Sequence, residues 1–256
     1  MKFLGQPSIM KQLGIYLPQL YAEKTGMNFL VTGPSGYGKT LLVLSCCNYL
    51  ANKGRFQYTS PSPEKGLVKF DLTSWVNFID EVHELKSPEF LYPILDKKEH
   101  VIFLATNESG LLKEPLVNRC IPLIFEEYSK EDLLLILREA YKYPVSEEFL
   151  LEIIKAGNNN PRLIISLAQR LNMVTKQIGI PSNIKVTLEE IFGIRDGLDL
   201  ASQRYLEILE KLGGRASLYT LNSVLHINKS AILYQIEPVL LYTGKIQITS
   251  KGRILV

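Results

Sequence analysis

The chain has few of the features that mark secreted or membrane proteins. Only three of its 256 residues are cysteines, Cys46, Cys47 and Cys120, and their odd number and spacing fit neither a disulfide framework nor a metal site. The sequence holds no run of about 18 apolar residues that could cross a membrane. Its first residues lack the apolar stretch of a secretory signal. We therefore expect a reduced, cytoplasmic protein.

A strong charge of either sign is also lacking. Lys and Arg number 29 against 26 Asp and Glu, which gives a net charge of +3. The excess lies at the C-terminal end, where residues 199–256 carry seven basic and four acidic side chains. A polyanion would be attracted mainly to that end, although a solvated, weakly basic face accounts for the charge as well. The 46% of hydrophobic residues suffices for a large core and excludes extended disorder.

Residues 1–127 alternate short apolar runs with stretches of helical periodicity. This alternation predicts a parallel sheet with helices on both faces, that is, an α/β domain. We expect strands at 28–32, 56–59, 75–79, 101–106 and 120–125. We also expect Ser87 to cap a helix that runs to about Leu95.

The pattern changes twice in the rest of the chain. Residues 128–198 predict a small all-helical lid domain of four helices, the last opened by a capping box at Thr187–Glu190. Residues 199–256 predict three helices followed by a β-hairpin around Ser250–Gly252. Three helices and a terminal hairpin are the parts of a winged helix.

Residues 33–40 fit the spacing G-x-x-x-x-G-K-[ST] at every fixed position, after a predicted strand and before a predicted helix. Glycines let backbone N–H groups turn toward phosphate oxygens, and a helix N-terminus adds partial positive charge. We expect Lys39 to reach the β- and γ-phosphates of ATP and Thr40 to ligate Mg²⁺. The predicted nucleotide-binding residues are Gly33, Pro34, Ser35, Gly36, Tyr37, Gly38, Lys39, Thr40 and Leu41.

An apolar strand ends in Asp80 and Glu81, forty residues after this loop. Asp80 would hold Mg²⁺ through water, and Glu81 would act as general base for the attacking water. Asn107 ends the next strand, where it would face the γ-phosphate between the acid strand and the loop. An asparagine there by itself would be a turn residue. The second acid predicts hydrolysis as well as binding.

The order of these motifs resembles the AAA+ ATPases, and within them the chain is most similar to RuvB, the Holliday-junction branch-migration motor. The likeness covers nearly the whole chain. It rests on Leu4-Gly5-Gln6, on the segment 59–65, on the acid strand 78–83 and on the winged-helix pair Gly252-Arg253. It also includes Leu91-Tyr-Pro93, Glu114–Arg119 and Pro161-Arg162.

This resemblance implies further roles. Leu4 would lie on the adenine side of the nucleotide. Arg119 would act in trans on the γ-phosphate of a neighbouring subunit, which implies a homo-oligomer and a hexameric ring. An arginine at the developing phosphoryl charge is worth several powers of ten in rate. Pro161 and Arg162 would begin the sensor-2 helix, with Arg162 on the γ-phosphate in cis. Without the resemblance, each arginine would be read as a surface ion pair.

The chain departs from RuvB between the acid strand and the next strand. RuvB carries a hairpin there that docks its partner RuvA, whereas Leu85–His100 is only sixteen residues long. A helix uses most of that length, so RuvA docking is not expected and a different protein partner is. Arg119-Cys120 is as similar to the Ser-Arg-Cys of clamp loaders as to RuvB.

In winged helices the third helix usually enters the major groove and the wing contacts the backbone or the minor groove. The third helix here offers Lys229, and the wing offers Lys245, Lys251 and Arg253. Contacts of these cations with phosphate would bind DNA without sequence preference. A winged helix can also bind protein. The resemblance favours DNA and Arg253 as its first contact.

Three functions remain open on the sequence. The first is a ring-forming, ATP-driven motor on double-stranded or branched DNA. The second is an ATP-dependent loader of a clamp or a helicase, which works through a protein partner. The third is an ATP-switched scaffold without catalysis, and Glu81 argues against it.

Overall fold

The computed structural model describes residues 3–52, 54–61 and 74–256. Its contacts divide the chain into two compact units, Met1–Leu135 and Ile136–Val256. The division falls inside helix α5 (Lys130–Ala140). The three-domain division with boundaries after residues 127 and 198 therefore stays a prediction. Among the described residues, no helix combines the length and the apolar character needed to cross a membrane.

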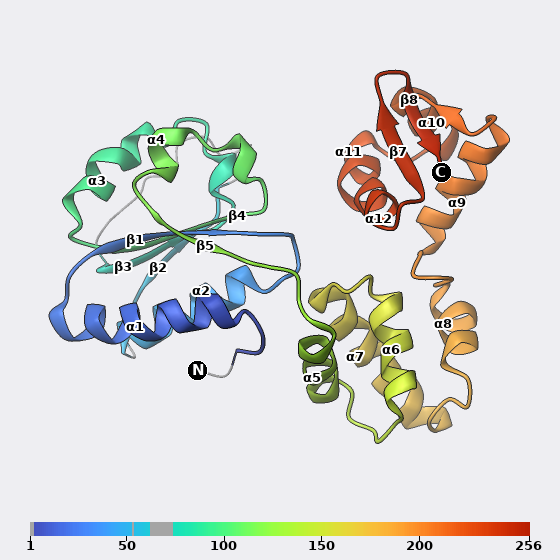
Figure 1. Ribbon diagram of the computed structural model, residues 1–256, viewed down its shortest axis with the longest axis horizontal. Helices are drawn as coiled ribbons and strands as arrows, with labels where there is room; N and C mark the ends of the chain where they lie inside the picture. The colour runs from blue at the N-terminus through green and yellow to red at the C-terminus, as the bar shows by residue number, and fades with distance from the viewer. Residues whose placement is uncertain (1–2, 53, 62–73) are drawn as a thin grey trace. The chain divides into compact units, whose positions relative to one another are not determined.

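The first unit is built on a five-stranded parallel sheet, as the sequence predicted. The strands lie in the order β2-β3-β4-β1-β5 (Figure 1), so the loop-bearing strand β1 has β4 and β5 as neighbours. Strands β3 and β4 are also paired in parallel. The strand bounds are β1 Met27–Thr32, β2 Gln57–Thr59, β3 Val76–Ile79, β4 Val101–Thr106 and β5 Ile121–Ile124.

Helices cover both faces of this sheet. Figure 1 shows α1 (Pro7–Glu23) and α2 (Lys39–Ala51) on one face and α3 (Tyr92–Lys97) and α4 (Glu114–Val117) on the other. Because side chains alternate along a strand, each strand contributes to two separate cores. Phe29 and Phe103 stack at 4.9 Å in the core under α1 and α2, whereas Leu30 packs in the core under α3.

The connection from β3 to β4 differs in detail from the prediction. It contains two 3₁₀ turns, Val82–Glu84 and Pro88–Leu91, before α3 begins at Tyr92. Ser87 lies at the N-cap position before Pro88, as predicted, but its side chain makes no capping hydrogen bond and a 3₁₀ turn begins there in place of an α-helix. Proline at the first position still favours the turn, since its missing N–H has no partner to lose there.

The second unit begins with a group of four helices. They are the C-terminal part of α5, α6 (Glu147–Ala156), α7 (Pro161–Ile178) and α8 (Ile184–Phe192). The predicted capping box at Thr187 is wrong. Helix α8 starts earlier, because Asn183 accepts hydrogen bonds from the backbone N–H groups of Lys185 and Val186. The Thr187 hydroxyl bonds back to the Asn183 carbonyl within the helix.

A winged helix completes the second unit, as predicted. Its helices are α9 (Leu200–Lys211), α10 (Leu218–Leu225) and a third formed by α11 (Lys229–Ala231), a π turn (Ile232–Ile236) and α12 (Glu237–Tyr242). The hairpin β7 (Ile246–Thr249) and β8 (Gly252–Leu255) is joined by a short strand, β6 (Arg215–Ala216), which the sequence did not indicate.

The π turn in the third helix has a local cause. Pro238 lies two residues after its end and has no backbone N–H to donate to the carbonyl four residues earlier. The helix widens by one residue before this proline, which is a common way of accommodating it.

Candidate functional site

The loop after β1 has the backbone of a phosphate-binding loop. Gly33, Gly36 and Gly38 have φ angles of 144°, 84° and 92°, a region that side chains with a Cβ rarely enter. A Cβ on Gly33 would lie 2.5 Å from the Cβ of Phe125. Gly38 then caps α2, so the N-terminus of that helix points into the loop. The loop is therefore shaped by its glycines to present backbone N–H groups to an anion.

Lys39 is held over the loop by the loop's own carbonyl groups. Its Nζ donates to the oxygens of Gly33 at 2.7 Å and Pro34 at 2.9 Å, and its side chain is buried. A buried ammonium needs such partners. Phosphate oxygens carry more negative charge than carbonyls and would be stronger partners at the same place.

Thr40 and Asp80 form a pair of oxygen ligands suited to Mg²⁺. The Thr40 hydroxyl donates to Oδ2 of Asp80 at 2.8 Å, although forty residues separate the two in sequence. Tyr58 also donates to this oxygen, at 3.4 Å. Mg²⁺ prefers oxygen ligands and usually binds one or two carboxylates plus substrate phosphates. The donor set therefore fits the ion beside the phosphate loop.

Glu81 lies at a sharp turn immediately after β3. Its φ of 49° is unusual for a residue other than glycine, and such strain gathers at functional sites. Burial, and then the negative charge of Asp80, raise the pKa of its carboxyl group above the ordinary value. Its Oε2 atom is buried and accepts no hydrogen bond within the described residues. This carboxylate can accept a proton from a water molecule.

Asn107 follows β4, and the sheet order puts it where the sequence predicted. Strand β4 lies between β1 and β3, and Thr106 is paired with Thr32 in the last position before the loop. Asn107 itself is exposed at this edge. The edge thus brings together the loop, the acid pair and Asn107. Its contact with nucleotide stays a prediction.

The N-terminal segment contacts the chain that follows β5, and the adenine-side place of Leu4 stays a prediction. The Gln6 side chain exchanges two hydrogen bonds with the backbone of Glu126, at 2.8 and 2.9 Å. Tyr128 donates from its hydroxyl to the carbonyl of Tyr37 at 2.8 Å. Leu4 is half-buried there, whereas Leu41 on α2 is exposed. Of the segment 59–65, residues 62–65 lie outside the described residues.

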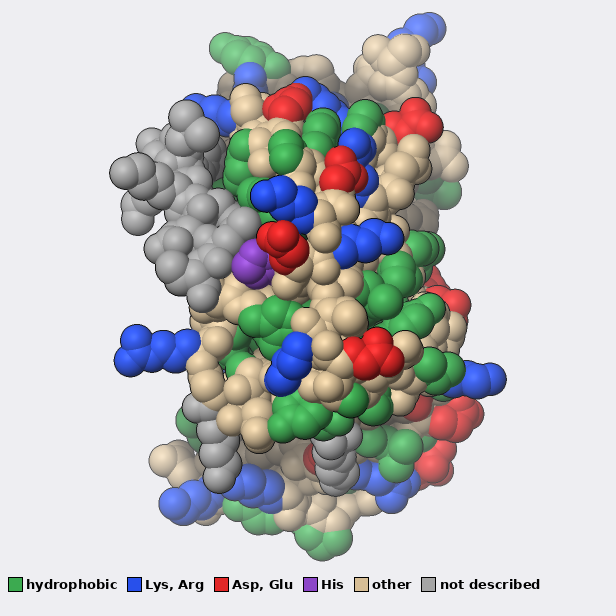
Figure 2. Space-filling view, turned by 90° about the vertical axis from the view of Figure 1, so that its left-hand side faces the viewer, with side chains coloured by type: hydrophobic (Ala, Val, Ile, Leu, Met, Phe, Trp, Pro, Cys, Tyr) green, Lys and Arg blue, Asp and Glu red, His purple; other side chains and the backbone are tan. Residues whose placement is uncertain are grey.

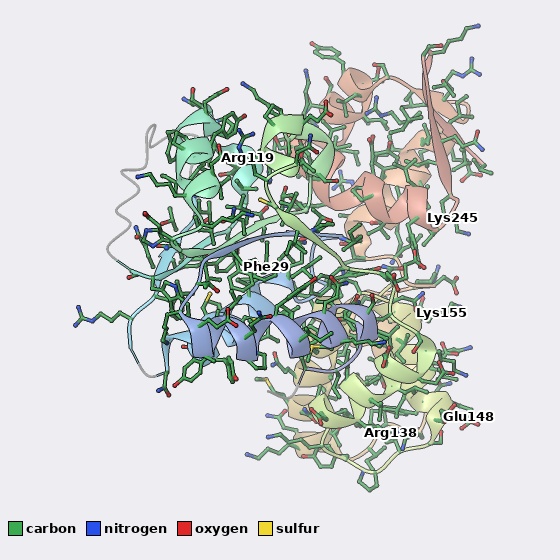
Figure 3. All side chains as sticks on the ribbon, turned by 60° about the vertical axis from the view of Figure 1, so that its left-hand side comes forward. Phe29, Arg119, Arg138, Glu148, Lys155 and Lys245 are labelled. Carbon is green, nitrogen blue, oxygen red and sulfur yellow. The ribbon has the colours of Figure 1, made fainter. Side chains whose placement is uncertain are left out.

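Arg119 has partners within its own subunit. Its Nε and Nη2 donate to the two carboxylate oxygens of Asp96 at 2.9 and 3.2 Å, and Nη1 donates to the Pro115 carbonyl at 2.7 Å. The guanidinium also lies 4.8 Å from the ring centroid of Tyr92. Figure 3 places Arg119 on the α3 and α4 side of the sheet. Its action on a neighbouring subunit stays a prediction.

Pro161 and Arg162 begin α7 in the second unit, as predicted. The Asn160 side chain accepts from the backbone N–H of Arg162 at 3.1 Å and caps the helix. The Arg162 side chain is exposed. Its role as a sensor of the γ-phosphate stays a prediction.

Arg253, the predicted first DNA contact, is engaged with a carboxylate of its own domain. Its Nε and Nη2 donate to the carboxylate of Glu237 at 2.7 and 3.1 Å, and its side chain is only 13% exposed. Glu237 also accepts from the Tyr205 hydroxyl at 2.9 Å and is 1% exposed. In the structure its guanidinium ties the wing to α12, and its contact with DNA stays a prediction.

Three lysines of the winged helix are exposed, as a DNA contact requires. Lys229 lies at the start of α11, Lys245 directly before the hairpin and Lys251 in its turn. Figure 3 shows Lys245 at the base of the wing, pointing away from the domain. On the face shown in Figure 2, basic and acidic side chains are interspersed, as the weak net charge predicts.

Three residues that we assigned no role lie close to the predicted ones. They are His83, Asp96 and Tyr128. His83 follows Glu81 by two positions, which was a usable signal. The sequence gave no signal for Asp96 or Tyr128. Their partners, Arg119 and Tyr37, are far away in sequence and come close only when the sheet has formed.

Comparison with known proteins agrees with this geometry. The family described as the RuvB C-terminal winged helix domain matches residues 195–256. The Holliday junction branch migration complex subunit RuvB of Campylobacter lari is 28% identical, over 98% of this chain and 86% of the relative. That of Mycoplasma genitalium is 26% identical, over 99% and 92%. The Thermotoga maritima RuvB motor structure has a TM-score of 0.82 at 26% identity, over 99% and 93%.

The chain is therefore similar to RuvB in sequence and in structure over nearly its whole length. Its fold class is confirmed: a P-loop α/β domain with a parallel sheet, a small helical domain and a C-terminal winged helix. In the RuvB-like chain, residues 80–100 form 3₁₀ turns and α3 and contain no strand.

Proposed function

We propose that the RuvB-like chain is a subunit of an ATP-driven motor that acts on double-stranded or branched DNA, as in Holliday-junction branch migration. The observation that carries the proposal is the contact of Thr40 with Asp80 beside a formed phosphate loop, with Glu81 next to both. This arrangement occurs in a chain similar over nearly its full length to branch migration subunits.

ATP binding would draw on the loop and its lysine. The backbone N–H groups of residues 33–40 surround the phosphates, and Lys39 exchanges its two carbonyl partners for phosphate oxygens. Thr40 and Asp80 would hold Mg²⁺, which when bound neutralises the charge that develops on the phosphates. The residues named here thus position ATP before any bond is broken.

Hydrolysis would divide the work between two subunits. Glu81 accepts the proton of the attacking water, and Asn107 orients the γ-phosphate from the adjacent strand end. Arg119 of a neighbouring subunit stabilises the developing phosphoryl charge. To do so, Arg119 must first break its hydrogen bonds with Asp96. Because Arg119 acts on the site of another subunit, fast turnover requires assembly in a ring.

DNA would be bound through the winged helix. The exposed lysines Lys229, Lys245 and Lys251 suit contacts with phosphate, which supply affinity that depends on salt and not on sequence. A motor that moves along DNA needs this kind of contact, since it must release each position readily.

The test is ATP turnover by the purified full chain, alone and with duplex or four-way-junction DNA. We expect DNA to stimulate turnover and the Arg119→Ala variant to lose most of it. Turnover that no DNA changes, in a protein that also fails to bind duplex DNA at moderate salt, would refute the proposal.

A loader of another ring is the second candidate. The observation in its favour is the connection between β3 and β4, where 3₁₀ turns and α3 stand in place of the hairpin that docks RuvA in RuvB. A loader would bind ATP but hydrolyse it slowly, with or without DNA, until its partner protein is added.

A further inference from the structure

His83 lies beside both the predicted general base, Glu81, and the end of strand β4. It lies in the 3₁₀ turn after β3, and its side chain is 12% exposed. Its Nδ1 is 2.9 Å from the Thr106 hydroxyl oxygen and 3.5 Å from Oε2 of Glu81. Its Nε2 is 3.7 Å from Oε1 of Glu108. One imidazole thus lies between two carboxylates and a buried threonine.

The Thr106 hydroxyl joins this ring to the end of β4. Its oxygen accepts the backbone N–H of Glu108 at 2.9 Å and has a second lone pair toward Nδ1. A proton on Nδ1 faces both this oxygen and Oε2 of Glu81, whereas a proton on Nε2 faces the Glu108 carboxylate. Each nitrogen thus lies beside polar groups at the end of β4 that carries Asn107.

This arrangement leaves Glu81 dependent on His83 for its position. Oε2 of Glu81 is buried and has no hydrogen-bond partner in the described part of the chain, and the imidazole of His83 packs beside it. The side chain of a glutamate has several rotamers, and a base that is misplaced by about 1 Å can cost about 100-fold in rate. A ring fixed to β4 restricts the carboxylate to one side of the turn.

We propose that His83 is a positioning residue for the general base Glu81, and that it ties this base to the strand end at Thr106 and Glu108. The inference rests on the proposed function, because it assigns His83 a part in ATP hydrolysis. When the end of β4, where Asn107 would meet the γ-phosphate, shifts, the His83 imidazole moves with it and changes the position of Glu81. His83 touches neither the nucleotide nor the reacting water in this account.

The test compares three replacements at this position in the full chain. His83→Ala removes the ring, His83→Asn keeps an amide near the place of Nδ1, and His83→Gln keeps one near Nε2. We expect kcat for ATP to fall about 10- to 100-fold in His83→Ala. We expect His83→Asn to recover most of this loss and His83→Gln little of it, because the Nδ1 side faces Glu81.

Two further readouts separate positioning from a structural role. Binding of a fluorescent ATP analogue should keep its Kd in all three variants, since the loop, Thr40 and Asp80 are intact. His100→Ala is the matched control. His100 also flanks β4, but it bonds the Ser74 carbonyl at 3.1 Å at the other end of the strand, and turnover should not change.

Glu108→Gln offers a second route if His83→Ala folds poorly. It weakens the partner of Nε2 at a half-exposed position in the loop after β4. We expect a smaller loss of kcat than in His83→Ala, and a double variant no worse than His83→Ala alone, because both changes act on one contact.

The outcomes distinguish a failure of the inference about His83 from a failure of the proposed ATPase function. Wild-type turnover in His83→Ala and Glu108→Gln would overturn the inference and leave the ATPase intact. A loss confined to nucleotide affinity would overturn it as well. A wild-type chain without any ATP turnover would refute the proposed function, and the inference with it.

Discussion

The surroundings of Glu81 change the pKa of its carboxyl group. Burial removes water from it, and Asp80 adds a negative charge nearby, so its pKa lies above that of a free glutamate. A base with a raised pKa takes up a proton more readily, which suits general-base catalysis near neutral pH.

The pH dependence of turnover should report this pKa. Because a protonated Glu81 cannot accept the water's proton, kcat/KM should be full above the raised pKa and fall as pH drops through it, at a higher pH than the ordinary value of 4.5. A pH profile of kcat/KM checks this, since that ratio reports the groups of the nucleotide-free protein. Glu81→Gln should lower kcat by about 10²- to 10⁴-fold and still bind ATP. An acid limb at or below 4.5, or unimpaired turnover in Glu81→Gln, would contradict the assignment.

The sequence identified the residues of the site better than their partners. Lys39, Thr40, Asp80 and Glu81 could be assigned because a strand, a glycine-rich loop and a second acidic strand have fixed relations in a parallel sheet. The partner of Arg253 could not be assigned, since Glu237 lies sixteen residues earlier on a helix and nothing local in the sequence links the two side chains.

At the scale of elements, the strands were predicted well and the helix starts less so. The five strands of the sheet are short apolar runs between turn residues, and β4 matches its predicted bounds at both ends. The start of helix α8 was misplaced, because several polar residues near one another can each act as a cap and local sequence does not decide among them.

The phosphate loop should not tolerate a side chain at its first glycine. In Gly33→Ala the new Cβ would lie 2.5 Å from the Cβ of Phe125, at a φ of 144°. We expect the free energy of unfolding to fall by about 1–3 kcal/mol, and ATP-analogue binding to be lost. Gly110→Ala, where nothing lies within 4 Å, is the matched control. Equal stability and equal nucleotide affinity in the two variants would show that the loop is not held as described.

The wing should depend on the buried pair of Glu237 and Arg253. Glu237→Ala leaves the guanidinium without its carboxylate in a nearly closed site, at a cost of about 3–5 kcal/mol. Hydrogen exchange of the β8 amides, measured in the full chain, should speed up accordingly. Lys155→Ala removes an exposed pair with Asp196 and should change stability by about 1 kcal/mol or less. Unchanged exchange in Glu237→Ala would mean that the pair does not hold the wing.

At the scale of the whole molecule, the account requires more than one copy of the chain. Each active site would combine Glu81 of one subunit with Arg119 of the next. Within a single subunit Arg119 is bound to Asp96 and Pro115 and lies beside Tyr92. No signal in the sequence shows this engaged state, since it depends on α3 and α4 meeting on one face of the sheet.

Mixing two inactive variants should restore turnover. An Arg119→Ala subunit still supplies Glu81, and a Glu81→Gln subunit still supplies Arg119, so mixed assemblies contain complete sites. We expect the mixture to hydrolyse ATP faster than either variant alone. The double variant mixed with Arg119→Ala is the control and should remain inactive. If size-exclusion chromatography shows that mixed assemblies form, but they gain no ATPase activity, Arg119 does not act across the interface.

The most direct measurement of the central claim is branch migration of a synthetic four-way junction by the full chain. With ATP and Mg²⁺, we expect the labelled junction to be resolved into its two duplex products. We expect no product without ATP or with Glu81→Gln. A wild-type chain that binds the junction and hydrolyses ATP, yet leaves the junction intact, would contradict the account of this protein as a DNA motor.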